Sequence, residues 1–138
     1  MNAADEYLET RVLTASPQEL HLMVIDGAIR HALQAQTAIR EDDFETSHFA
    51  LNQAREFVME LLSGLDEKQG GDVVRQLKGL FGFVYRNLNE ADLHRDPVKV
   101  ADALRILEMH RETWTELIER RKSETADGDT RTRLNRTT

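Results

Sequence analysis

The sequence predicts an all-α protein: an antiparallel up-down four-helix bundle with a short N-terminal arm and a disordered C-terminal tail. Three observations support this fold class. The chain of 138 residues contains only two prolines, and strong helix formers dominate its composition. Four segments repeat apolar residues at helical spacing. Two of these segments open with a helix-start signal, Ser16-Pro17 and Asp96-Pro97.

The first long helix is predicted from residue 17 to about residue 40. Ser16 is a capping residue, and Pro17 lacks only an N–H that has no partner at the first helical position anyway. Glu19 completes the capping box Ser16-x-x-Glu19, in which both side chains accept bonds from free backbone donors. The apolar stripe is wider than a surface helix needs, so this helix should be central. Its members are Leu20, Leu22, Val24, Ile25, Ala28, Ile29, Ala32 and Ala35, with His31 among them.

Three more helices are expected. Glu41-Asp42-Asp43 caps the second, which should end near Gly64. Residues 65–71 include two consecutive glycines and are expected to form a loop before the third helix. Asp96-Pro97 starts the fourth, whose periodicity is lost beyond Lys122. Their stripes are Phe44, Leu51, Ala54, Val58, Leu61 and Leu62; Val73, Leu77, Leu80, Phe81, Val84, Leu88 and Ala91; and Val100, Leu104, Leu107, Trp114, Leu117 and Ile118.

A chain of this length predicts one domain. We expect an N-terminal arm at residues 1–15, the helical bundle at 16–122, and a polar, disordered tail at 123–138. The arm carries Tyr7, Leu8, Val12 and Leu13 but is too short to be a stable helix alone. Its apolar groups should therefore dock, either permanently on the bundle or as a detachable arm that covers a partner's groove.

Composition and charge exclude several function classes. Cysteine is absent, which removes disulfides, thiolate zinc sites and thiol nucleophiles and fits the cytoplasm. The N-terminus is acidic and no apolar run could cross a bilayer, so we expect a soluble protein without stable membrane insertion. The net charge is −7, and residues 121–138 hold five basic and three acidic residues, which leaves −9 for residues 1–120. Such an acidic body should repel nucleic acid.

Two enzyme-class alternatives for a helical bundle find little support. Glu45-x-x-His48 has the ligand spacing of a di-iron centre, but a second Glu-x-x-His is missing. A phosphotransfer histidine needs a nearby cation and a small residue, a setting that none of the five histidines has. His31 lies on an apolar face, where a satisfied core role is expected. Phosphate-loop, nucleophile-elbow and zinc motifs are also absent, so we expect no catalytic residue, no metal, no cofactor and no enzymatic activity.

Glycines inside the predicted helices are the more informative anomaly, because each costs about 1 kcal/mol relative to alanine. They are Gly27, Gly79 and Gly82. Gly79 and Gly82 are three residues apart and share one helix face, which leaves a shallow groove. Either a neighbouring helix of the bundle or an incoming helix could occupy that groove.

Several segments, in order and spacing, resemble the FliS family of flagellin export chaperones from about Tyr7 to about Arg120. They are Tyr7 and Val12; Thr14-Ala15-Ser16-Pro17; residues 22–29; Leu65-Asp66 with Gly70-Gly71-Asp72; Leu77, Leu80 and Leu88; and Trp114. The resemblance implies a cytoplasmic chaperone that binds the C-terminal segment of flagellin and prevents premature polymerisation. It also implies delivery to the flagellar export apparatus, a type III secretion system, with the export gate protein as a further partner.

The resemblance implies flagellin-binding residues on the arm and on the third helix, as groove residues or as the core beneath a groove. These residues are Tyr7 and Val12, and Leu77, Leu80, Phe81, Val84 and Tyr85. The family usually has Tyr-Asp-Tyr-Met where this chain has Phe81-Gly82-Phe83-Val84, and only Tyr85 could restore a hydroxyl on the Phe81 face. A helical adaptor or chaperone for a different secreted protein is therefore the competing interpretation.

Overall fold

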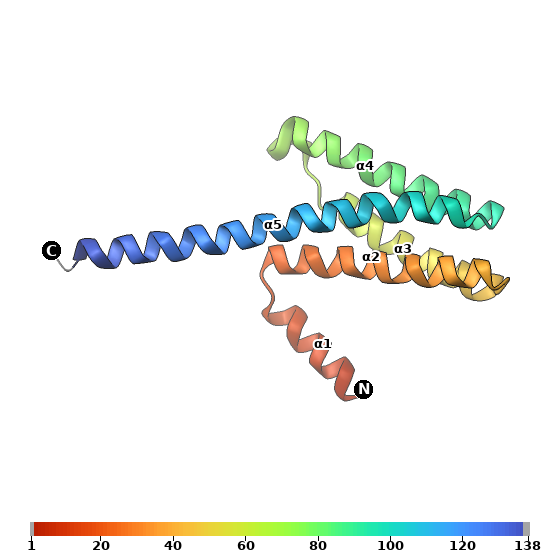
Figure 1. Ribbon diagram of the computed structural model, residues 1–138, viewed down its shortest axis with the longest axis horizontal. Coiled ribbons are helices and arrows are strands. Elements are labelled where there is room, and N and C mark those ends of the chain that lie inside the picture. Colours follow the sequence, from red (N-terminus) through yellow and green to blue (C-terminus); the bar gives the residue numbers. More distant parts are fainter. Residues whose placement is uncertain (1, 137–138) are drawn as a thin grey trace.

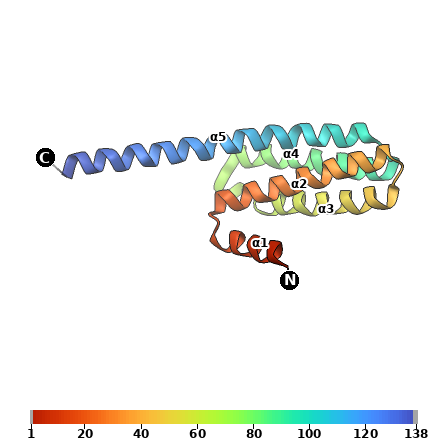
Figure 2. The same cartoon turned by 60° about the horizontal axis from the view of Figure 1, so that its bottom comes forward.

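Four of the protein's helices form the bundle that the sequence predicts. The computed structural model describes residues 2–136, and the side chains of residues 2–128. Over that range it has five helices: α1 (Ala3–Thr14), α2 (Pro17–Arg40), α3 (Phe44–Ser63), α4 (Glu67–His94) and α5 (Pro97–Arg136). α2 to α5 pack around one core, with α2 and α4 each between α3 and α5, whereas α1 is set apart (Figures 1 and 2). The predicted all-α four-helix bundle is confirmed.

The helix starts are capped at the residues that the sequence singles out. Ser16 Oγ accepts a hydrogen bond from the backbone N–H of Glu19 at 3.2 Å, and Pro17 is the first residue of α2. Hydrogen bonds from Thr46 to the Asp43 carboxylate at the start of α3 lower the pKa of Asp43. Asp96 accepts a bond from the Val98 N–H at 2.9 Å, where Pro97 opens α5. Side chains thus satisfy the first free backbone donors of these helices.

Small residues on α2 let its neighbours approach closely. Ala28, Ala32 and Ala35 are fully buried. A Cβ built on Gly27 would lie 2.7 Å from the Phe57 ring of α3, so this glycine makes room for an aromatic ring. The largest side chains that are fully buried around α2 come from all four bundle helices: Ile25, Leu51, Val58, Phe81, Val84, Leu88, Val100 and Leu107.

The connection from α3 to α4 differs from the loop expected at residues 65–71. Asp66 caps α4 by accepting a bond from the backbone N–H of Lys68 at 3.0 Å, and one helical turn forms before the glycines. At Gly71 the backbone takes φ 55° and ψ −131°, a conformation that glycine adopts readily. The glycines therefore kink α4 after its first turn, and the helix begins at Glu67 because a capping residue precedes it.

The C-terminal helix also extends further than expected. The sequence predicts a disordered tail at residues 123–138, but α5 continues to Arg136; residues 137 and 138 lie outside the described range. Residues 119–128 are exposed and bury nothing, so backbone hydrogen bonding and helix propensity extend the helix without tertiary packing. α5 therefore projects away from the bundle (Figure 1). No helix in the described part of the chain is both long and apolar enough to cross a membrane.

Candidate functional site

The N-terminal arm is a helix that rests over a groove between α2 and α3. Asn2 caps α1 by accepting a bond from the backbone N–H of Asp5 at 2.9 Å. α1 buries none of its residues: Tyr7 is 67% exposed and Val12 46% exposed. The arm thus touches the bundle without being packed into it. The pocket between them has a volume of about 560 Å³ and is lined by Leu8, Arg11 and Val12 of α1 and by Leu20, Met23, Val24, Asp26, Arg30, Phe57 and Glu60.

A second pocket lies between α3 and α4 and adjoins the first. Its volume is about 490 Å³, and Phe57 and Glu60 line both pockets. Tyr85 of α4 contributes an aromatic ring to it. The remaining lining residues come from α3: Asn52, Gln53, Arg55, Glu56 and Met59. Part of the α3 surface is therefore flanked on both sides by open, partly apolar space.

Phe57 is the groove residue that sequence reasoning missed. It directly precedes Val58 of the predicted apolar stripe and was not assigned to the core or to a site. The signal that could have found it is Gly27, whose missing Cβ leaves room for the Phe57 ring. The His31 ring of α2 also stacks on the Phe57 ring, with the two ring centres 5.6 Å apart.

His31 does not have the satisfied core role expected for it. Its Nδ1 is buried without a hydrogen-bond partner, and the ring as a whole is half-buried. Burial, and to a smaller extent the nearby Arg30 charge, lower the pKa of His31. The ring therefore supports the Phe57 side of the groove as a neutral, stacked aromatic group.

The seven residues expected to bind a client divide by burial. Phe81 and Val84 are fully buried in the core, so they support the surface and do not form it. Leu77, Leu80 and Tyr85 are half-buried on α4, and Tyr7 and Val12 are exposed on α1. The seven do not meet in one groove: Val12 lines the pocket under α1, whereas Tyr85 lines the pocket between α3 and α4.

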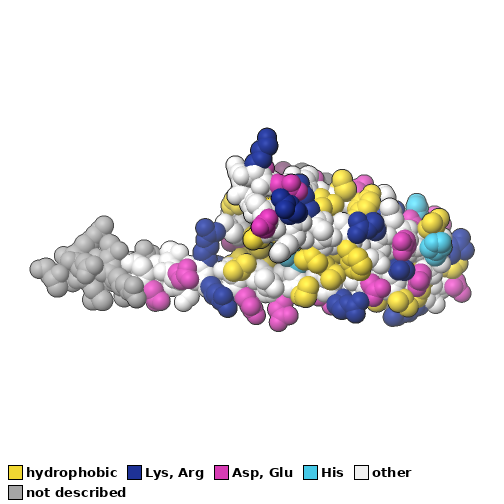
Figure 3. All heavy atoms as spheres, turned by 90° about the horizontal axis from the view of Figure 1, so that it is seen from above, with side chains coloured by type: hydrophobic (Ala, Val, Ile, Leu, Met, Phe, Trp, Pro, Cys, Tyr) yellow, Lys and Arg dark blue, Asp and Glu magenta, His cyan; other side chains and the backbone are white. Residues whose placement is uncertain are grey.

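Residues 81–84 of α4, which differ from the usual family sequence, have an outer face that lies beside Gly79 and Gly82. Phe83 is 39% exposed. A Cβ on Gly79 would meet nothing within 4 Å, and one on Gly82 would meet only the Arg86 guanidinium at 3.4 Å. These two glycines therefore mark open surface and not a close helix contact. Figure 3 views the molecule from the α4 side and shows hydrophobic side chains gathered in a band between charged ones.

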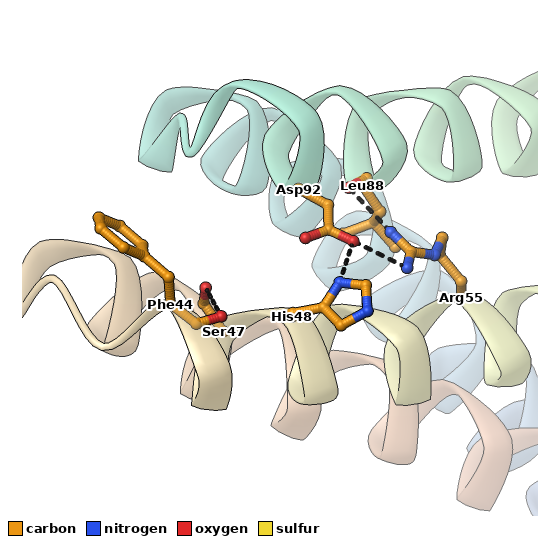
Figure 4. A network of polar contacts seen from close by, with 6 residues as sticks. All are labelled: Phe44, Ser47, His48, Arg55, Leu88 and Asp92. Atoms are coloured by element: carbon orange, nitrogen blue, oxygen red, sulfur yellow. Dashed lines mark hydrogen bonds and ion pairs between the residues drawn. The ribbon is translucent and has the colours of Figure 1, made fainter.

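A polar network connects α3 to α4 near the C-terminal end of α4. The Asp92 carboxylate accepts hydrogen bonds from His48 Nδ1 at 2.8 Å and from Arg55 at 3.0 Å (Figure 4). Arg55 also donates to the Leu88 carbonyl. His48, the histidine of the Glu45-x-x-His48 pattern, thus makes its contact with Asp92 across the two helices. Among the described residues, no group of three or more His, Asp or Glu side chains is placed to hold a metal.

Residues 1–121 match the family described as Flagellar protein FliS. The chain belongs to the FliS family. The flagellar secretion chaperone FliS of Campylobacter jejuni is 27% identical over 115 residues, which cover 83% of this chain and 90% of that protein. The Salmonella typhimurium chaperone of the same name is 28% identical over 111 residues, covering 80% of this chain and 82% of the relative.

The fold agrees with this assignment to the FliS family. A crystal structure described as a flagellar chaperone from bacteria has a TM-score of 0.70 to this chain at 14% identity, covering 86% of this chain and 96% of that one. The FliS match includes α1 and the whole bundle and ends at residue 121. The outer part of α5 therefore lies beyond the FliS match.

Proposed function

We propose that this FliS-family chain is a cytoplasmic flagellar secretion chaperone for the C-terminal segment of flagellin. It prevents premature polymerisation and assists delivery to the flagellar export apparatus, where the export gate protein is a second partner; it is not an enzyme. The observation that carries the proposal is α1, which covers an apolar pocket of about 560 Å³ and buries none of its own residues. The names of the curated relatives point to the same class of function.

The groove under α1 suits an amphipathic client helix. A segment that buries its apolar face only in a polymer is unpaired in the monomer, and a hydrophobic groove can take that face instead. Leu20, Met23, Val24 and Phe57 provide the apolar lining. The chaperone thereby substitutes for the neighbouring subunits of the polymer.

α1 is placed to give way to the client at little cost. It is joined to α2 through Ala15 and Ser16, both with extended backbone. Because none of its residues is buried, moving it exposes little additional apolar area. Leu8 and Val12 then leave the groove, while Tyr7, which does not line the pocket, is free to contact the client.

The α4 surface extends the proposed client-binding region beyond α1. Leu77, Leu80 and Tyr85 are half-buried and so can gain further burial against a client helix. Phe81 and Val84 hold this surface in place from the core. The client-binding residues are therefore Tyr7 and Val12 on α1, Leu77, Leu80 and Tyr85 on α4, and the groove lining under α1. Phe81 and Val84 are supporting residues.

Titration calorimetry tests the proposal. The full chain is titrated with cognate flagellin and with flagellin that lacks its C-terminal segment. We expect saturable binding to the intact protein and loss of binding to the truncated one. Equal binding to both, or binding to neither, contradicts the proposal.

One observation favours a second candidate, a chaperone for a different exported protein. Phe81-Gly82-Phe83-Val84 lacks both hydroxyls and the carboxylate of the usual family segment, and the side chain that it exposes is the apolar Phe83. A pull-down from flagellated cells with the full chain as bait separates the two candidates. Recovery of flagellin supports the first, and recovery of another exported flagellar protein in its place supports the second.

A further inference from the structure

Two histidines from different helices touch where α2 begins. Nε2 of His21 on α2 lies 3.0 Å from Nε2 of His110 on α5. A hydrogen bond between these atoms needs one nitrogen with a hydrogen and one without. The contact therefore exists when both rings are neutral, or when the donor ring alone carries a second proton on its Nδ1.

Aromatic side chains from two helices, α4 and α5, pack against this pair. The Trp114 ring centre of α5 is 4.2 Å from that of His21, and the Phe81 ring of α4 meets His110 edge-on at 4.9 Å. Trp114 also donates its Nε1–H to the Gln18 carbonyl in the first turn of α2, at 3.0 Å. The cluster thus ties the start of α2, and the hinge that carries α1, to α4 and α5.

Among the described side chains, no carboxylate forms an ion pair that would stabilise a protonated His21 or His110. Burial, and then the charge of His110, lower the pKa of His21 from 6.5 to about 4, and burial lowers the pKa of His110. Arg111, which follows His110 on α5, pairs with Asp26 of α2, and Lys78 of α4 pairs with Glu67. Within the described side chains, neither imidazole forms an ion pair with a carboxylate.

We propose that the His21–His110 contact is an acid-sensitive latch that holds the first turns of α2 against α5. The latch stays closed with at most one added proton. The second proton gives both Nε2 atoms a hydrogen and both rings a positive charge, so the contact is lost. Opening frees the first turns of α2 and uncovers the Phe81 side of the cluster.

The direction of the pH effect follows from these shifts. Because each histidine pKa is lower in the folded protein, the unfolded chain binds more protons in mildly acidic solution, and stability falls as the pH falls. The contribution of the pair is fully present above the ordinary histidine pKa of 6.5. It is lost progressively as the pH falls towards about 4.

Trp114 is the only tryptophan of the chain and lies beside His21, so it reports on the latch directly. We would record Trp114 fluorescence of the full chain from pH 8 to pH 3, together with far-UV circular dichroism. We expect a fluorescence transition as the pair takes up its second proton. His21→Gln keeps a hydrogen-bonding group that cannot be charged and should move this transition to lower pH by about one unit. A His21→Gln profile that superimposes on the wild-type profile overturns the proposal.

His94→Gln is the matched control, because His94 is exposed near the end of α4, and it should leave the fluorescence profile unchanged. A shift as large as that of His21→Gln would contradict the latch. If His21→Gln does not fold at neutral pH, assigned histidine ring proton resonances of the wild-type chain decide the matter. The resonances of His21 and His110 should titrate below pH 6.5, and titration of both near pH 6.5 would overturn the proposal.

Discussion

At the scale of single residues, burial separates neighbours that have the same chemistry. Phe81 and Phe83 are two positions apart on α4, which places them on different faces of the helix. Phe81 is fully buried and meets His110 edge-on, whereas Phe83 is 39% exposed. A sequence pattern can mark both as important, but only the packing assigns one to the core and the other to the surface.

This difference predicts unequal losses of stability for the same substitution at the two sites. Phe81→Ala should lower the free energy of unfolding by about 3–5 kcal/mol, because it removes a fully buried ring and leaves a cavity. Phe83→Ala, the matched control, should cost less than about 1 kcal/mol, because its ring is 39% exposed. Urea denaturation measures both effects. A larger stability loss for Phe83→Ala would contradict the burial that separates the two rings.

Alanine substitutions at two glycines should change the stability in opposite directions. Gly27→Ala places a Cβ 2.7 Å from the Phe57 ring, and the forced displacement should cost about 1–3 kcal/mol of stability. Gly79→Ala meets nothing within 4 Å and should stabilise the helix by about 0.5–1 kcal/mol. Thermal denaturation of both variants tests this. Equal effects would show that Gly27 is not needed for the approach of α2 and α3.

At the scale of helices, the helix starts that depend on a capping residue were predicted correctly from the sequence. Ser16-Pro17, Asp43 and Asp96-Pro97 act within three residues of themselves, so the starts of α2, α3 and α5 follow from the chain alone. The first turn of α4 was missed because the Asp66 cap competes with two glycines, and the sum of these small energies decides the outcome. The extent of α5 was missed because an exposed helix shows no apolar periodicity.

The groove could be predicted only in part. Tyr7 and Val12 were assigned to a surface arm, and they are exposed on α1. The pocket lining was beyond sequence reasoning, because Phe57 lines the pocket from α3 while its ring packs against Gly27 of α2. Contacts between residues that are far apart in sequence can be identified only from the packed structure.

The independence of α1 from the core gives a prediction for the arm. Tyr7→Ala should weaken client binding several-fold while changing the free energy of unfolding by less than about 0.5 kcal/mol, because Tyr7 is 67% exposed. Calorimetry and thermal denaturation measure the two effects, with Glu9→Ala as an exposed control on the same helix. A large loss of thermal stability in Tyr7→Ala would mean that the arm is part of the folded core.

At the scale of the whole molecule, the bundle and the α5 projection are energetically separate. Each bundle helix packs on two neighbours around a shared core. Beyond Trp114 and Ile118, α5 has only exposed residues through residue 128. The FliS match ends at residue 121, three residues beyond Ile118.

Truncation therefore separates the projection from the chaperone body. A chain that ends at Lys122 should keep the unfolding temperature of the full chain within about 2 °C, since residues 123–128 are exposed, and should still bind the client. Far-UV circular dichroism should show the loss of the helix that runs to Arg136.

The matched variant is Trp114→Ala in the full chain. It removes the ring that packs on His21 and the hydrogen bond to the Gln18 carbonyl, and it should cost about 2–4 kcal/mol of stability. If the truncated chain loses as much stability as Trp114→Ala, the outer part of α5 must pack on the bundle, and the two parts are not separate.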